Sequence, residues 1–99
     1  MGEYGRYAVY MVTSRKYGPI YTGVTGNLLN RMVTHRDELI DGFTARYHLH
    51  QLVYFEQFDS PSDAILREKR IKKWRREWKI ALIEKANPAW DDLFDSIVY

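Results

Sequence analysis

The chain has 99 residues, enough for one domain; 45% are hydrophobic and 15% aromatic, and the formal net charge is +2. The absence of cysteine excludes disulfide frameworks and thiolate metal sites. No apolar run approaches the ~18 residues of a membrane span, and residues 1–5 lack signal-peptide character. We therefore expect one domain over residues 1–99, located in the cytoplasm without a membrane partner, as a monomer or weak dimer.

The chain is expected to begin with a β-hairpin. Residues 7–13 are dense in β-branched and aromatic side chains, a composition that favours a strand. A turn containing Gly18 and Pro19 follows, and residues 20–24 form a second short strand. The two strands are close enough in sequence to pair in antiparallel fashion.

A helix is expected over about residues 27–40. Thr25 or Asn27 can cap its start, because their side-chain oxygens can accept hydrogen bonds from free backbone N–H groups. Gly42 suits its C-terminal end. The predicted apolar stripe contains Leu28, Met32, His35 and Leu39.

The second half of the chain adds a strand and further helices. Residues 49–55 read as a third strand, and Ser60 can cap a helix that continues to about residue 85, with a break near residues 74–77. The aromatic tail, residues 89–99, is expected to pack as a short helix or turn. The order β-β-α-β-α, with helical material at the end, predicts an α+β fold with a small three-stranded antiparallel sheet.

Glu68 is the most unusual residue of this second helix. On one continuous helix it would share a face with Ala64, Ile71, Trp78 and Leu82. A carboxylate in an apolar stripe costs several kcal/mol unless it is paired or bound to a metal. One interpretation is a structural ion pair with an arginine of the first helix. The other is a single carboxylate ligand for Mg²⁺, which usually keeps most of its waters and takes one or two protein carboxylates.

Arg31 and His35 are spaced i, i+4 and so share a face of the first helix. A lone histidine in an apolar stripe is more often a satisfied core residue. The arginine one turn away favours a phosphate site, because a guanidinium matches phosphate bidentately and an imidazole can exchange a proton with the scissile group.

Tyr10 and Tyr21 lie on the two strands of the hairpin, so their hydroxyls can converge on one patch. Strand tyrosines are mostly packing residues, and the unperturbed tyrosine pKa of ~10 makes each a poor base. Gly23 lacks a side chain beside Tyr21, which would let a backbone or a substrate approach.

Residues 67–79 hold eight basic and two acidic residues, a local charge of 8 − 2 = +6, so the rest of the chain is near −4. Cations for phosphates, interleaved with tryptophans for stacking, predict a nucleic-acid surface. The alternative is a solvated helix face with Trp74 and Trp78 in the core. The candidate nucleic-acid-binding residues are Lys69, Lys72, Lys73, Arg75 and Arg76.

Taken together, these residues resemble the GIY-YIG nuclease superfamily, and more closely its small stand-alone bacterial members. Ala8-Val9-Tyr10 and Tyr21-Thr22-Gly23 correspond to the two triplets of the family name. The first triplet departs from the family pattern, because it has alanine and valine in place of glycine and isoleucine. In addition, Asn30 stands where some members of the superfamily have a lysine. The resemblance covers nearly the whole chain, including Arg31, His35, residues 52–56, residues 64–76 and residues 87–90.

The resemblance implies an endonuclease that cuts DNA, structured or single-stranded, with one Mg²⁺ or Mn²⁺ ion, in DNA repair or recombination. Tyr21 would be the general base for a water held by the metal, and Tyr10 would orient the attacking group or phosphate. Arg31 would stabilise charge on the phosphoryl oxygens, with His35 assisting. Glu68 would hold the ion.

Gly23 and Asn87 are candidate supporting residues, Asn87 as the late polar residue of the superfamily. Two other functions stay open. The first is a non-catalytic nucleic-acid-binding module that retains the fold, and the second is a protein-interaction domain that uses the tail, residues 90–99.

Overall fold

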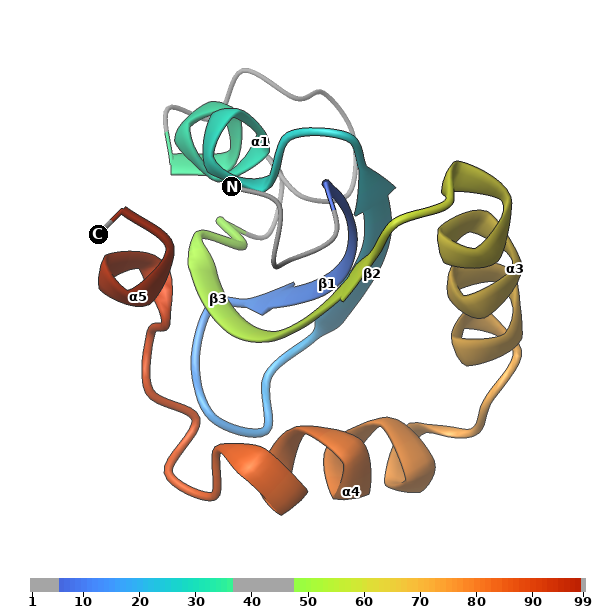
Figure 1. The fold of residues 1–99 in the computed structure, drawn as a ribbon. Coiled ribbons are helices and arrows are strands. Elements are labelled where there is room, and N and C mark those ends of the chain that lie inside the picture. Colours follow the sequence, from blue (N-terminus) through green and yellow to red (C-terminus); the bar gives the residue numbers. More distant parts are fainter. Residues whose placement is uncertain (1–5, 37–47, 99) are drawn as a thin grey trace.

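Three strands form an antiparallel sheet in the order β2-β1-β3, and the helices pack around it, in a computed structural model that describes residues 6–36 and 48–98 (Figure 1). The expected α+β fold is confirmed. The strands are β1 (Tyr7–Thr13), β2 (Ile20–Thr25) and β3 (Gln51–Phe58), and the helices are α1 (Leu28–Arg36), α3 (Pro61–Lys72), α4 (Arg76–Ala86) and α5 (Phe94–Val98).

The third strand starts and ends later than the predicted range 49–55. His48 has a φ of 55°, which is left-handed rather than extended backbone, so the strand begins only at Gln51. At its other end, pairing between Tyr7 and Phe58 prolongs the strand. Composition alone could not show how far the partner strand extends.

β1 is the central strand, and its register with β2 determines which side chains of the candidate site lie next to one another. Tyr10 lies opposite Gly23 and Val12 lies opposite Tyr21. Because side chains alternate between the two faces of a strand, Tyr10, Val12 and Tyr21 share one face, whereas Val9 and Met11 point to the other.

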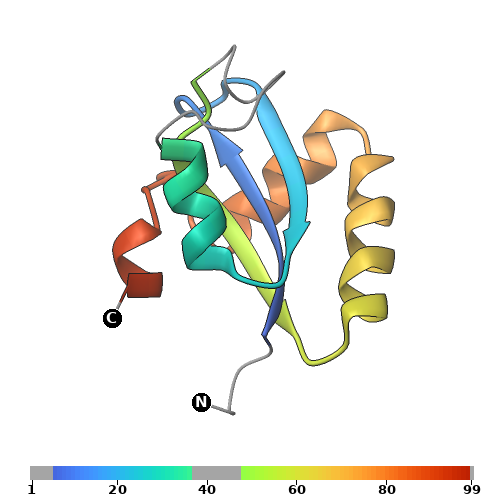
Figure 2. The ribbon, with the colours of Figure 1, turned by 90° about the horizontal axis from the view of Figure 1, so that it is seen from above.

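Two hydrophobic cores cover the two faces of the sheet. Leu28 and Met32 of α1 pack with Tyr10 and Val12, and α5 adds partly buried residues at the edge of this core. The second core joins residues of α3 and α4 to Val9, Met11 and Val53. Helices α1 and α3 consequently lie on either side of β2, as Figure 1 and Figure 2 show from two directions.

The predicted helix starts are confirmed. Asn27 Oδ1 accepts a hydrogen bond from the backbone N–H of Asn30 at 3.0 Å, and Ser60 Oγ accepts one from Asp63 at 3.4 Å. The predicted apolar stripe of α1 is confirmed for Leu28, Met32 and His35, which are all buried. The predicted stripe residue Leu39 and helix end Gly42 lie outside the described residues.

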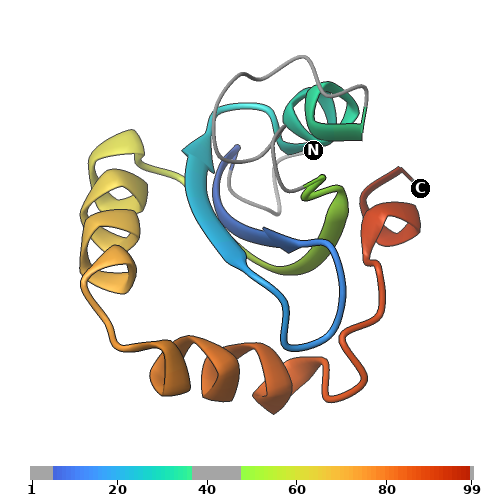
Figure 3. The same cartoon turned by 180° about the vertical axis from the view of Figure 1, so that it is seen from behind.

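The predicted break in the second helical region is also present, between the end of α3 at Lys72 and the start of α4 at Arg76. It changes which residues share a face. Ala64, Glu68 and Ile71 are buried together on α3, but Trp78 is 52% exposed. The expectation that Trp78 lies on the face of Glu68 was therefore wrong, because the two residues belong to helices of different direction (Figure 3).

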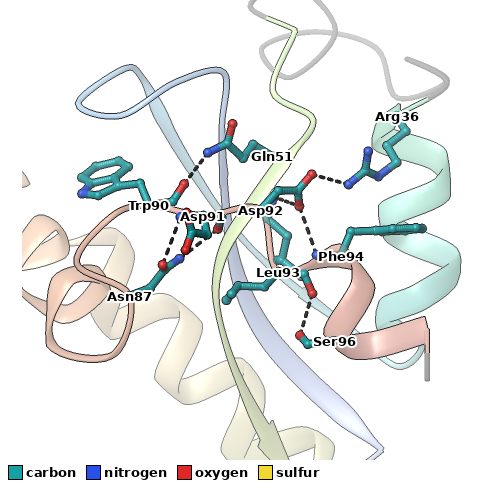
Figure 4. Close-up of polar contacts among 10 residues, drawn as sticks. Arg36, Gln51, Asn87, Trp90, Asp91, Asp92, Leu93, Phe94 and Ser96 are labelled. Atoms are coloured by element: carbon teal, nitrogen blue, oxygen red, sulfur yellow. Dashed lines mark hydrogen bonds and ion pairs between the residues drawn. The ribbon is translucent and has the colours of Figure 1, made fainter.

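The tail returns along β3 and closes the domain. Figure 4 shows Asn87 Nδ2 donating to the carbonyl of Asp91 at 2.9 Å, and the same amide donates to the carbonyl of Val53 at 3.0 Å. Trp90 is 1% exposed, Leu93 donates to the Leu52 carbonyl at 2.7 Å, and Asp92 pairs with Arg36 of α1. The expected short helix is α5. No helix in the described part of the chain has the length and apolarity to cross a membrane.

Candidate active site

Tyr10 is fully buried, and its ring lies across the backbone of Gly23. A Cβ atom at position 23 would come within 2.5 Å of the Tyr10 hydroxyl and 2.6 Å of the ring. Glycine is therefore required here by a side chain of the protein itself. The space that the sequence suggested for a backbone or a substrate is filled by Tyr10.

The Tyr10 hydroxyl is the centre of a polar cluster. It hydrogen-bonds Nε2 of His35 at 3.0 Å and accepts a hydrogen bond from Nη1 of Arg31 at 3.3 Å. Burial raises the Tyr10 pKa to about 12, although Arg31 opposes this rise. Tyr10 therefore stays protonated at neutral pH and acts as a hydrogen-bonding group rather than a base.

His35 is 2% exposed and neutral at pH 7. Burial, and to a lesser extent the positive charge of Arg31 and the proximity of His50, lower its pKa to about 4. Its Nδ1 atom has no hydrogen-bond partner among the described residues. His35 can therefore exchange a hydrogen bond with Tyr10 without adding a second cation beside Arg31.

Tyr21 completes what we call the tyrosine cluster: Tyr10, Tyr21, Arg31 and His35. The Tyr21 ring centroid lies 6.3 Å from that of Tyr10 and 5.9 Å from that of His35. Tyr21 is only partly buried. The two tyrosine rings are therefore neighbours, and Tyr21 is the one closer to solvent.

Glu68 approaches this cluster from α3. It is 8% exposed, and its Oε2 atom pairs with Nζ of Lys72 at 2.6 Å. The ion-pair interpretation was therefore right about a pair but wrong about the partner, which is a lysine one turn along α3 and not an arginine of α1. The Lys72 ammonium also lies 5.6 Å from the centre of the Tyr21 ring, so it connects Glu68 to the cluster.

Residues 6–81 match the family described as the GIY-YIG catalytic domain. This range includes the tyrosine cluster and Glu68. The chain belongs to the GIY-YIG family. Similar proteins include a UPF0213 protein of Staphylococcus saprophyticus, 34% identical over 81% of this chain and 96% of that protein, and one of Staphylococcus haemolyticus, 36% identical over the same shares. A UPF0213 protein of Pediococcus pentosaceus is 36% identical over 67% of this chain and 70% of its own length. No solved structure matches the chain.

GIY-YIG nucleases are generally metal-dependent, and among the described residues the buried carboxylate of Glu68 could hold an ion. In the described residues, no three histidine or carboxylate side chains form a metal-binding group. A single buried carboxylate fits Mg²⁺, which keeps several of its waters. The Lys72 ammonium, 2.6 Å from Glu68 Oε2 and 5.6 Å from the centre of the Tyr21 ring, puts that carboxylate near the tyrosine cluster.

The predicted nucleic-acid-binding residues of this GIY-YIG domain separate into two groups. Lys69 and Lys73 are exposed and unpaired among the described residues. Lys72 is paired with Glu68, Arg75 stacks over Trp78 at 4.9 Å, and Arg76 donates to the carbonyl of Tyr17 at 2.6 Å. Only the first two are wholly available to a phosphate as they stand.

Lys79 is a further cation that sequence reasoning counted but did not assign to the site. Burial lowers its pKa, and the positive charges of Lys72 and Arg76 also lower it, so Lys79 interacts electrostatically with both. The pairing of Lys72 was also missed, although the i, i+4 spacing from Glu68 is the signal that indicates such a pair on a helix.

The exposed side of α4 carries an aromatic groove of about 290 Å³ next to this basic region. The Trp74 and Trp78 rings meet edge to face, with centroids 6.1 Å apart. The alternative that both tryptophans are simply core residues therefore fails for Trp78. The groove is lined by Trp74, Trp78, Ala81, Leu82 and Lys85.

A second polar network holds α3 to β3. Arg67 makes a bidentate pair with Glu56, at 2.8 Å from Nη2 and 2.9 Å from Nε, and Tyr54 donates to the same carboxylate. Hydrogen bonds from Arg67 and Tyr54 lower the Glu56 pKa despite its burial. This network orients α3, and with it Glu68, against the sheet.

Proposed function

We propose that this GIY-YIG domain is a metal-dependent endonuclease that hydrolyses phosphodiester bonds in DNA. The observation that carries the proposal is the Tyr10 hydroxyl, held by Arg31 and His35 beside Tyr21. A partly buried cluster of this kind offers both a cation for a phosphate and groups that exchange protons. Action in DNA repair or recombination, a cytoplasmic location and a monomer or weak dimer remain predictions.

The two tyrosines take different roles in the proposed reaction. Tyr10 is protonated and its hydroxyl is held by Arg31 and His35, so it would orient the phosphate or the attacking water by hydrogen bonding and not act as a base. Tyr21 is more accessible and has the Lys72 ammonium near its ring, so it is the better candidate for taking the proton of the attacking water. Arg31 reaches the same space and stabilises charge that develops on the phosphoryl oxygens.

Glu68 would hold the ion, either Mg²⁺ or Mn²⁺. A bound ion at this carboxylate would neutralise the developing charge of the leaving oxygen. The contribution of the chain is to keep the carboxylate oriented: Glu68 sits on a helix fixed to β3 by Arg67 and to the second core by Ile71.

The test is cleavage of labelled duplex, single-stranded, flapped and branched DNA by purified protein with Mg²⁺ or Mn²⁺. Glu68→Gln and Tyr21→Phe are expected to lose ~10²-fold or more of the rate, because each removes a group that acts on the reacting atoms. Glu77→Gln and Tyr17→Phe are matched controls, since both residues are exposed. Equal background cleavage by wild type and Glu68→Gln on every substrate would contradict the enzyme proposal.

The second candidate function is a non-catalytic nucleic-acid-binding module. It is supported by the exposed Lys69 and Lys73 and by the open aromatic groove, which do not depend on the tyrosine cluster. It predicts salt-sensitive binding that Glu68→Gln leaves intact and that charge removal at Lys72 and Lys73 weakens. Absence of binding at low ionic strength, where phosphate contacts are strongest, would exclude it.

A further inference from the structure

Lys72 occupies the cation position of the proposed metal site. Its ammonium lies 2.6 Å from Glu68 Oε2, and Glu68 is the buried partner of the pair, with a side chain 10% exposed against 47% for Lys72. The Lys72 pKa is raised, first of all by this hydrogen bond to Glu68. The carboxylate therefore already has a counter-ion before any metal arrives.

A divalent ion and an ammonium compete for the same carboxylate. Both need direct contact with its oxygens, and two cations in contact with one carboxylate repel each other strongly in a partly buried site. In the described part of the chain there is no further acidic or histidine cluster that could take the ion instead. Metal binding that involves Oε2 of Glu68 thus requires Lys72 to move.

The structure also provides a reason for Lys72 to leave. Its side chain is about half exposed, and the flexible four-carbon stem of lysine lets the ammonium reposition. Burial lowers the pKa of Lys79, and the positive charges of Lys72 and Arg76 also lower it, so Lys79 interacts electrostatically with both. A phosphate near these three cations would attract Lys72 away from Glu68.

Building on the proposed function, we infer that Lys72 is a displaceable counter-cation of Glu68, which a divalent ion must replace and which then binds nucleic-acid phosphate. Metal and nucleic acid would therefore bind with positive cooperativity, since each favours the arrangement in which Lys72 has left Glu68. By linkage, the two ligands strengthen each other by the same factor.

The first test measures Mn²⁺ binding to the protein alone, from the electron paramagnetic resonance signal of free Mn²⁺. Lys72→Met should bind Mn²⁺ roughly tenfold more tightly than wild type, within the usual range of coupling between sites. Lys73→Met removes the same charge from an unpaired neighbour and should change the affinity by about twofold or less. Lys72→Gln, which keeps a hydrogen-bonding group for Glu68, is the second variant if Lys72→Met unfolds, and thermal melts check folding.

Glu68→Gln separates the failure of this inference from failure of the proposed function. If Glu68→Gln abolishes Mn²⁺ binding but Lys72→Met and Lys73→Met behave alike, the metal site stands and the role of Lys72 is refuted. If Glu68→Gln binds Mn²⁺ as wild type does, the proposed metal site is wrong and the inference falls with it.

The second test measures the affinity of a labelled oligonucleotide with and without Mn²⁺ at matched ionic strength, in a Tyr21→Phe background that suppresses cleavage. Mn²⁺ should tighten binding to the protein that retains Lys72 and to the Lys73→Met variant. The gain should be lost in Lys72→Met, because no ammonium is released. An equal gain in all three proteins would overturn the coupling.

Discussion

At the scale of single residues, Gly23 is required by the ring that lies over it. The Tyr10 ring occupies the place where any side chain at position 23 would stand. Gly23→Ala is expected to displace Tyr10 and to lower the free energy of unfolding by about 1–3 kcal/mol, the usual cost of overpacking a core. Urea denaturation followed by tryptophan fluorescence measures the loss.

Gly26→Ala is the matched control for this variant. A Cβ atom there would lie 3.5 Å from the Tyr7 ring, an ordinary contact. If both variants lose the same stability, the cost at Gly23 arises from the backbone and not from the Tyr10 ring.

His35 predicts a pH dependence of stability. Its pKa is about 4 in the folded protein against 6.5 ordinarily, so between these values the unfolded chain binds more protons. The folded state therefore loses stability as the pH falls from about 6.5 to 4, by on the order of 3 kcal/mol in the limit. His35→Gln should show a smaller difference in unfolding free energy between pH 7 and pH 4.

Glu56 also makes the stability depend on pH, because its pKa is lowered in the folded protein, so the informative quantity is the difference between wild type and variant. Parallel stability curves for wild type and His35→Gln would show that the buried imidazole accepts a proton without cost.

At the scale of secondary structure, the break between α3 and α4 exposes the aromatic groove. Trp78 is 52% exposed and carries Arg75 over its ring. Trp78→Ala is expected to weaken binding of single-stranded oligonucleotides by ~1–3 kcal/mol, the usual contribution of one stacked base. Fluorescence anisotropy measures the binding.

Leu66→Ala serves as the control, because Leu66 is 49% exposed on α3 and does not line the groove. Weaker binding in Leu66→Ala to the same extent would indicate a general effect of removing exposed apolar surface. An unchanged affinity of Trp78→Ala would exclude base stacking in the groove.

Asn87 holds the tail to the sheet. Its amide donates to Val53 and Asp91, and its carbonyl oxygen accepts from the Asp91 N–H at 3.0 Å. Asn87→Ala leaves buried backbone groups unpaired and is expected to cost about 1–3 kcal/mol of unfolding free energy. Asn30→Ala, on an exposed turn of α1, should change stability by far less in the same denaturation experiment.

At the scale of the whole molecule, charge is separated along the chain. Residues 67–79 hold eight basic and two acidic residues, a net charge of +6, whereas the whole chain has a net charge of +2. These residues form the end of α3, the start of α4 and the junction between the two helices. Lys73→Gln should lower the slope of log affinity against log salt for DNA by about one, because one phosphate contact is lost. Arg6→Gln, outside this segment, should leave the slope unchanged.

Local features of the sequence were sufficient to predict the strands and helices. The strand composition of β1, the Asn27 and Ser60 caps and the stripe of α1 are short-range patterns, and the structure has the same elements. The i, i+4 spacing of Arg31 and His35 likewise brought both side chains to one face of α1, where they meet Tyr10.

Tertiary structure decided what fills the space beside Gly23 and whether Trp78 is buried. Strand register sets the first, because pairing brings Tyr10 opposite Gly23. Helix direction sets the second, because the turn into α4 leaves Trp78 exposed to solvent. The pair between Glu68 and Lys72, in contrast, follows from their local i, i+4 spacing on α3. Local preferences act over a few residues, but register and helix direction follow from packing against distant parts of the chain.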